Sequence, residues 1–105
     1  MDSIKPKKFL GQHFLTDLSV AQRIANTVDA CPDIPILEVG PGMGVLTQYI
    51  IPKQRPFKVI EIDFDSVPYL HEHFPELGNN IIEGDFLKMN LQEVFDGKPF
   101  LLTGN

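Results

Sequence analysis

The chain has 105 residues, of which 43% are hydrophobic and 22% charged, and it carries a formal net charge of −5 at pH 7. This composition is typical of a folded globular protein, but the length allows at most one domain and is short for a doubly wound α/β domain, so we interpret the sequence as part of a longer chain. No run approaches the ~18 apolar residues of a membrane span, and the N-terminus lacks the apolar core of a signal peptide, which favours a cytoplasmic protein without a membrane partner.

Positive charge gathers at the N-terminus, where residues 1–16 are predicted to form a basic segment. Residues 1–23 have a net charge of +2, with Lys5, Lys7 and Lys8 in the stretch "KPKK", whereas residues 24–105 have a net charge of −7. Phosphate binding is driven largely by Lys and Arg, so only this segment favours nucleic acid as a partner. On composition alone, a solvated tail explains these lysines equally well.

The remaining pattern alternates between helices and strands. Apolar residues at helical spacing predict an amphipathic helix over 17–30, with Thr16 or Asp17 able to cap its first turn. The later elements are, in chain order, the strand 36–39, the helix 44–51 stopped by Pro52, the strand 57–62, the helix 65–74 capped by Asp65, the strand 80–85, the short helix 90–95 and the strand 99–105. This order indicates a parallel sheet with helices on both faces.

A glycine-rich turn, "GPGMG", joins the first strand to the second helix. Gly40, Gly42 and Gly44 follow the pattern G-x-G-x-G, whereas the dinucleotide fingerprint is G-x-G-x-x-G and requires a glycine where Val45 stands. No basic residue beside the turn suits a phosphate. The turn therefore favours a ligand without a pyrophosphate, or else a tight connection that binds nothing.

Two acids follow the next two strands. Glu61 ends the second strand, about twenty residues after the turn, where a carboxylate accepts hydrogen bonds from the two hydroxyls of a ribose. Asp85 comes just past the third strand, at the same edge of the sheet, where it could accept from the exocyclic amine of adenine. Together with the turn they predict an adenosine ligand, and S-adenosylmethionine fits because its sulfonium suits an acidic pocket.

The order of short motifs then becomes specific. "KKFLGQHFL", "EVGPGMGVLT", "EID", "EGDFL" and the final "GN" closely resemble the N-terminal part of the ribosomal RNA adenine dimethyltransferase family, over essentially the whole chain. The resemblance implies an α/β, Rossmann-like S-adenosylmethionine-dependent methyltransferase fold, truncated here after the fourth parallel strand. It also implies transfer of two methyl groups to the N6 of adenosines in small-subunit ribosomal RNA, a step of ribosome biogenesis.

Carried over by position, the resemblance implies the site residues. His13 and Leu15 would contact the methionine end of the cofactor and Gly40 the side of the turn. Glu61 would hold the ribose and Asp85 the adenine amine. Asn105 matches the first residue of the family's Asn-x-Pro-Tyr/Phe motif, where its amide oxygen would accept a hydrogen from the target amine, so it is both the predicted catalytic residue and a cofactor neighbour. His13 stands where many members have Asn.

The partner implied by the resemblance is ribosomal RNA in the immature small subunit. Two alternatives stay open. One is the related family that methylates a large-subunit adenine and confers macrolide resistance, although its members usually show Ser-Gln-Asn-Phe where this chain has "GQHF" and lack the proline of "GPG". The other is a non-catalytic RNA-binding or transcription factor on the same fold. Without the residues that would stack the target adenine, we expect the 105-residue chain itself to bind cofactor weakly at best and to methylate nothing.

Other residues receive weaker assignments. His71 and His73 lie two apart on a predicted helix, so they do not face each other and we predict no metal site. Lys53 and Arg55 are expected in a solvated turn. The last strand, residues 99–105, would form an exposed apolar edge in a chain of this length, which predicts self-association, most simply as a symmetric dimer.

Overall fold

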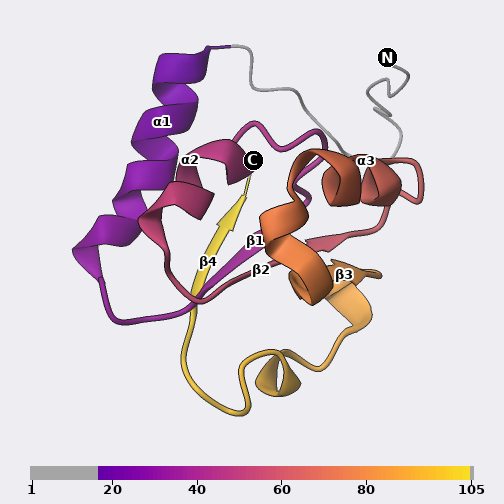
Figure 1. Ribbon diagram of the computed structural model, residues 1–105. Helices are drawn as coiled ribbons and strands as arrows, with labels where there is room; N and C mark the ends of the chain where they lie inside the picture. Colours follow the sequence, from indigo (N-terminus) through magenta and orange to yellow (C-terminus); the bar gives the residue numbers. More distant parts are fainter. Residues whose placement is uncertain (1–16, 105) are drawn as a thin grey trace.

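The computed structural model describes residues 17–104, which fold around one parallel β-sheet (Figure 1). The sheet has the strand order β3-β2-β1-β4, and every neighbouring pair is parallel. Its strands are β1 (Ile36–Val39), β2 (Phe57–Glu61), β3 (Ile81–Glu83) and β4 (Leu101–Gly104). The four predicted strands and the parallel α/β class are therefore confirmed, with strand ends one to two residues inside most of the predicted ones.

The three α-helices pack on one face of the sheet. They are α1 (Leu18–Asn26), α2 (Thr47–Ile50) and α3 (Ser66–His73), and their buried side chains form one core cluster with Ile36 and Val59 of the sheet. A second cluster, around Leu37 and Ile60, lies on the opposite face because successive strand residues point to opposite sides. That face is covered by residues 86–100, which contain only two 3₁₀ helices, η5 (Phe86–Lys88) and η6 (Leu91–Glu93).

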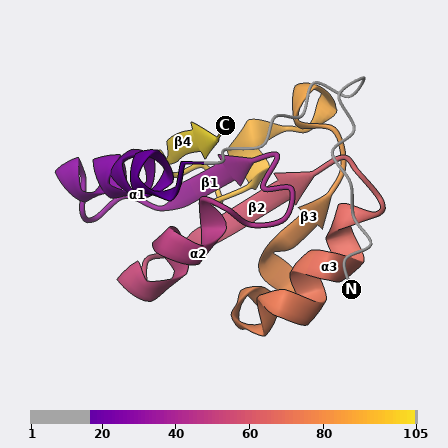
Figure 2. The same cartoon turned by 90° about the horizontal axis from the view of Figure 1, so that it is seen from above.

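The predicted helices thus cover both faces, but the one predicted over 90–95 on the second face is the 3₁₀ helix η6 and not an α-helix. The strand order explains which face each connection covers. The crossovers from β1 to β2 and from β2 to β3 step in the same direction, so right-handed connections put α2 and α3 on the same side. The connection from β3 to β4 returns past β1 and must cross the other face. Figure 2 shows the segment after β3 on the side of the strands away from α2 and α3. The direction reverses between β1 and β4, and ligands of open α/β sheets bind outside the carboxyl ends at such a reversal.

Local chemistry explains where the helices begin. The side chain of Asp17 accepts hydrogen bonds from the main-chain N–H groups of Ser19 and Val20, so the predicted cap of α1 is confirmed. The 3₁₀ helix η2 (Thr27–Ala30) follows α1 directly. In contrast, α2 is shorter than predicted, because Gly44 has a φ of +87° and belongs to the preceding turn. The α-helix ends at Ile50, just before Pro52, and a 3₁₀ helix, η3 (Ile51–Lys53), contains the proline.

The predicted cap of α3 is wrong. Asp65 occupies the N-cap position but makes no side-chain capping bond. Asp63 supplies the bonds instead: its Oδ1 accepts the N–H of Asp65 at 3.0 Å, its carbonyl accepts the N–H of Ser66 at 3.0 Å, and its Oδ2 accepts the Ser66 hydroxyl at 3.3 Å. The 3₁₀ helix η4 (Pro75–Asn80) then leads from α3 to β3. Pro68 lies in the first turn of α3, where proline is tolerated.

Arg55 is also not in a solvated turn, contrary to the prediction. Its guanidinium is partly buried and donates to three main-chain carbonyls in the link between α1 and β1, those of Val28, Cys31 and Ile34. Lys53 donates to Asn26 and Asp29 nearby. Carbonyls left over at the end of a helix need donors, and Arg55 supplies them, whereas Lys53 binds the side-chain oxygens of Asn26 and Asp29.

Candidate cofactor site

The glycine turn lies directly after β1, at the carboxyl end of the sheet. Gly40, Gly42 and Gly44 have φ values of +67°, +59° and +87°, a region that side chains other than glycine rarely adopt. The N–H of Gly40 donates to the carbonyl of Ile60 at 2.9 Å, which extends the pairing of β1 with β2 into the turn. A Cβ at Gly40 or Gly42 would meet nothing within 4 Å. The main chain of the turn therefore faces open space that a ligand can enter.

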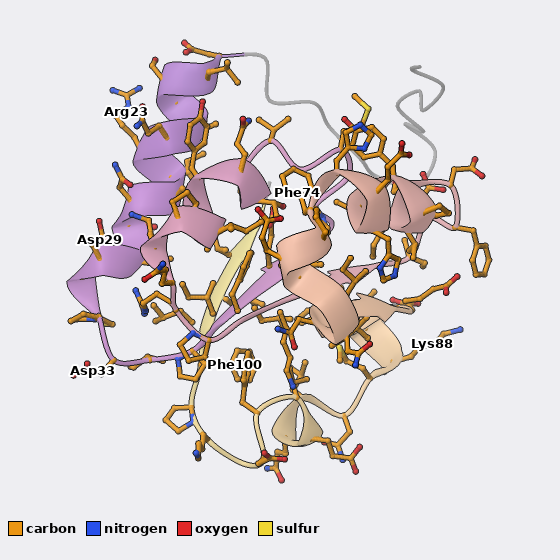
Figure 3. The ribbon with its side chains drawn as sticks, in the orientation of Figure 1. Arg23, Asp29, Asp33, Phe74, Lys88 and Phe100 are labelled. Atoms are coloured by element: carbon orange, nitrogen blue, oxygen red, sulfur yellow. The ribbon has the colours of Figure 1, made fainter. Side chains whose placement is uncertain are left out.

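Gly44 is glycine for a further reason. A Cβ at this position would lie 2.2 Å from Cε2 and 2.4 Å from Cζ of Phe74, so the ring occupies the volume of any side chain. Phe74 follows the last residue of α3, and Figure 3 shows it between α2 and α3. The third glycine thus reflects packing inside the protein, whereas the first two border open space.

Glu61 lies where the sequence predicts it, at the end of β2, and its side chain is buried. Its Oε1 accepts the N–H of Gly42 at 2.8 Å, and its Oε2 accepts the N–H of Asp63 at 3.1 Å. The carboxylate therefore joins the end of β2 to the glycine turn.

Asp85 lies at the same end of the sheet. The carbonyl of Glu61 accepts the N–H of Gly84 at 2.9 Å, which places the residues after β3 beside the end of β2. The Oδ1 of Asp85 accepts the N–H of Leu87 at 2.9 Å and caps η5. The turn, Glu61 and Asp85 are thus brought together at one edge, as predicted.

A second buried acid, Glu38 in β1, was not singled out from the sequence. It is 1% exposed, and its Oε1 accepts the hydroxyl of Thr47 in α2 at 2.6 Å. Burial raises the pKa of Glu38 to about 7; the Thr47 hydrogen bond opposes this and the nearby Glu61 carboxyl adds to it. The signal was available, because an acid inside the apolar strand "ILEV" just before a glycine turn is unusual.

Exposed apolar side chains that were not predicted from the sequence follow both Glu61 and Asp85 in the chain. Ile62 is 45% exposed, Phe64 74% and Leu87 86%. Large apolar residues in such positions are informative when they gather near a polar site.

Three of the predicted site residues, His13, Leu15 and Asn105, lie outside the described residues. The strand that leads to Asn105 ends beside the glycine turn, because Gly104 pairs with Val39, the residue before that turn. A Cβ at Gly104 would lie 2.6 Å from the carbonyl oxygen of Val39, so glycine permits the close approach of β4 to β1.

Residues 17–104 contain no group of three or more His, Cys, Asp or Glu side chains that could hold a metal ion. The ring of His73 stacks on Tyr69 with 3.9 Å between centroids, and both His71 and His73 are exposed on α3. Within the same residues, no helix has the length and apolar character needed to cross a membrane.

Comparisons with known proteins agree with this geometry. The profile of the ribosomal RNA adenine dimethylase family matches residues 3–105. The ribosomal RNA small subunit methyltransferase A of Phocaeicola vulgatus is 70% identical over 105 residues, which are 100% of this chain and 38% of that protein. The protein of the same name from Bacteroides fragilis is 69% identical and is covered to 39%.

A solved structure is similar as well. The crystal structure of the 23S rRNA methyltransferase ErmE superposes with a TM-score of 0.65 at 32% identity, covering 88% of this chain and 36% of that one. The fold and its glycine turn are those of the Rossmann-like methyltransferases. Within that class, the chain belongs to the ribosomal RNA adenine dimethylase family. It spans about 38% of the length of the curated relatives named above.

Proposed function

We propose that the protein transfers methyl groups from S-adenosylmethionine to the N6 of adenosines in small-subunit ribosomal RNA. The observation that carries this proposal is the 70% identity, across all 105 residues, to a protein named for methylation of the small-subunit RNA. The large-subunit alternative has weaker support, since ErmE is 32% identical.

The residues of the site fit this cofactor. The open space at Gly40 and Gly42 lets a ligand approach the main chain, and the buried carboxylate of Glu61 stands beside it. A carboxylate has about four acceptor positions, so Glu61 can hold main-chain N–H groups and ribose hydroxyls together. Asp85 would accept from the adenine amine, while His13 and Leu15 would contact the methionine end. When bound, the cofactor supplies a methyl group on a positively charged sulfur.

Asn105 would act on the target base. An adenine amine is a poor nucleophile because its lone pair is delocalised into the ring. By accepting an amine hydrogen, the amide oxygen of Asn105 would favour a pyramidal nitrogen whose lone pair points at the methyl group. The base must be unstacked or already single-stranded to reach this position. Asn105 is therefore our candidate catalytic residue.

The partner we propose is the immature small ribosomal subunit, met in the cytoplasm. The formal charge of residues 24–105 is −7, which disfavours phosphate contacts from that part of the chain as a whole. The lysines at positions 5, 7 and 8 are the basic residues nearest the N-terminus and are our candidates.

A methylation assay tests the function. The protein at its natural length is incubated with immature small subunits and methyl-labelled cofactor, and the RNA is digested to nucleosides. We expect label in dimethyladenosine from the small-subunit RNA, and none when large subunits are offered instead. Label in large-subunit RNA alone would establish the macrolide-resistance type, and RNA binding without label would establish the non-catalytic alternative.

We also propose that a polypeptide limited to residues 1–105 self-associates. Among the described strands, β4 pairs only with β1. Its Leu102 is 55% exposed, and an apolar strand edge with unpaired backbone groups is a template for a second copy.

A further inference from the structure

We propose that Phe74 is a positioning residue that holds the glycine turn in its ligand-binding shape. Its ring lies directly against Gly44, where a Cβ would be only 2.2 Å from Cε2. The N–H of Gly44 donates to the carbonyl of Pro41 at 2.8 Å, and its carbonyl accepts the N–H of Gln48 at 3.0 Å. Gly44 is therefore the residue at which the turn closes and is hydrogen-bonded to α2, and the ring of Phe74 packs against it.

Phe74 is itself held firmly. Its N–H donates to the carbonyl of Leu70 at 2.9 Å, and its carbonyl accepts the N–H of Leu77 at 3.0 Å. Leu70 is fully buried and Leu77 is 4% exposed, and the ring of Phe74 packs against the core cluster that contains both. The backbone on each side of Phe74 is thus hydrogen-bonded to buried residues, and its ring packs against the same core.

The two ends of α3 reach two parts of the candidate site. At its start, Ser66 is capped by Asp63, whose N–H donates to Oε2 of Glu61. At its end, Phe74 contacts Gly44. The N–H of Gly42 on Oε1 of Glu61 completes the connection. A closed path therefore runs from the acid, through α3, to the glycine turn and back to the acid.

This path gives α3 a role that is distinct from filling the core. If the ring at position 74 is made smaller, the turn loses the surface against which it is packed, and Gly42 can move relative to Glu61. Binding groups need placement within a fraction of an ångström, and displacement caused by a residue that does not touch the ligand weakens binding. This inference rests on the proposed function, because its readout is binding of S-adenosylmethionine.

The test compares two matched substitutions, Phe74→Leu and Phe57→Leu, in the protein at its natural length. Phe57 is a buried member of the core cluster against which Phe74 packs, but Phe57 begins β2, at the end of the sheet away from the turn. Calorimetric titration with S-adenosylmethionine and thermal unfolding without it are measured for each. We expect both variants to unfold at a lower temperature, whereas only Phe74→Leu weakens cofactor binding, by roughly tenfold.

With RNA as the second substrate, Phe74→Leu should raise the KM for the cofactor more than it lowers kcat. Equal loss of affinity in the two variants, or none in Phe74→Leu, would overturn the positioning role while leaving the proposed function intact. Failure of the unchanged protein to bind the cofactor would instead overturn the proposed function, and this inference with it.

A second measurement isolates the contact and needs no cofactor. Leucine lacks the Cε2 and Cζ atoms that approach position 44, so Gly44→Ala should lower the unfolding temperature less in the Phe74→Leu background than in the unchanged protein. The decrease in unfolding temperature that remains in the Phe74→Leu background is the cost of placing alanine at the positive φ of Gly44. Equal losses in both backgrounds would mean that the ring does not constrain the turn.

Discussion

The main-chain N–H of Gly42 donates to Oε1 of Glu61 at 2.8 Å, although the two residues are 19 positions apart. The acid that ends β2 therefore helps to hold the turn that follows β1, because one of its carboxylate oxygens binds the main chain of that turn. A substitution of Glu61 should consequently disturb the turn as well as any direct contact with a ribose.

Glu61→Ala should weaken binding of S-adenosylmethionine by an amount on the order of 1–3 kcal/mol, because buried hydrogen-bond partners are left unpaired. Glu76→Ala is the control, since Glu76 is an exposed acid on η4 and leaves the rim acids in place. Isothermal titration calorimetry measures both. Equal affinities in the unchanged protein and the Glu61 variant would remove Glu61 from the site.

The stability of the protein should depend on pH through Glu38. Its pKa is raised from 4.5 to about 7 in the folded state, so the folded state holds a proton that the unfolded chain releases earlier. This stabilisation is complete below about pH 4.5 and is lost as the pH rises through about 7, with an upper magnitude of about 3 kcal/mol.

Glu38→Gln keeps an oxygen for the Thr47 hydroxyl and cannot ionise. We expect the free energy of unfolding of this variant, relative to the unchanged protein, to increase between pH 5 and pH 8. Urea denaturation at both pH values, without cofactor, checks the difference. Parallel pH profiles would show that Glu38 titrates normally.

Arg55→Lys should destabilise the protein by about 1–3 kcal/mol, because an ammonium group cannot reach three carbonyls as the guanidinium fork does. Arg23→Lys is the matched control: Arg23 is exposed on α1, as Figure 3 shows, and this change should be nearly neutral. Chemical denaturation compares the two. A neutral Arg55→Lys would restore the interpretation of a solvated turn.

Replacement of Lys5, Lys7 and Lys8 with Gln should weaken binding to immature small subunits. The plot of log affinity against log salt should become shallower by roughly one unit for each lysine that contacts a phosphate. Lys98→Gln, an exposed lysine in the link before β4, serves as the control. An unaltered salt slope in the triple variant would assign the segment to a solvated tail.

Self-association of the 105-residue polypeptide should appear in light scattering as an apparent mass that rises with concentration toward a dimer. Leu102→Lys puts a charge on the exposed edge of β4 and should return the polypeptide to a monomer. A concentration-independent monomer without this substitution would mean that the edge is protected.

Much of the candidate site could be predicted because its elements are local. A cap such as Asp17, a turn with three glycines and an acid at a strand end each depend on a few neighbouring residues, and parallel strands necessarily bring their carboxyl ends to one edge. The position of Glu61 and Asp85 beside the turn follows from those facts. The bonds of Asp63, rather than Asp65, at the start of α3 do not follow from them, because they depend on the path of the chain between β2 and α3.

The amino-acid sequence by itself determined the parallel α/β class, the order of the strands along the chain, the family, and two of the acids at the rim. Only the tertiary structure decided that Phe74 excludes a side chain at Gly44, that Glu38 is buried against Thr47, and that Arg55 binds three carbonyls. The physical reason is that periodicity and turn chemistry act between neighbours. Steric exclusion, desolvation and hydrogen bonding between distant segments depend on how the helices pack on the sheet.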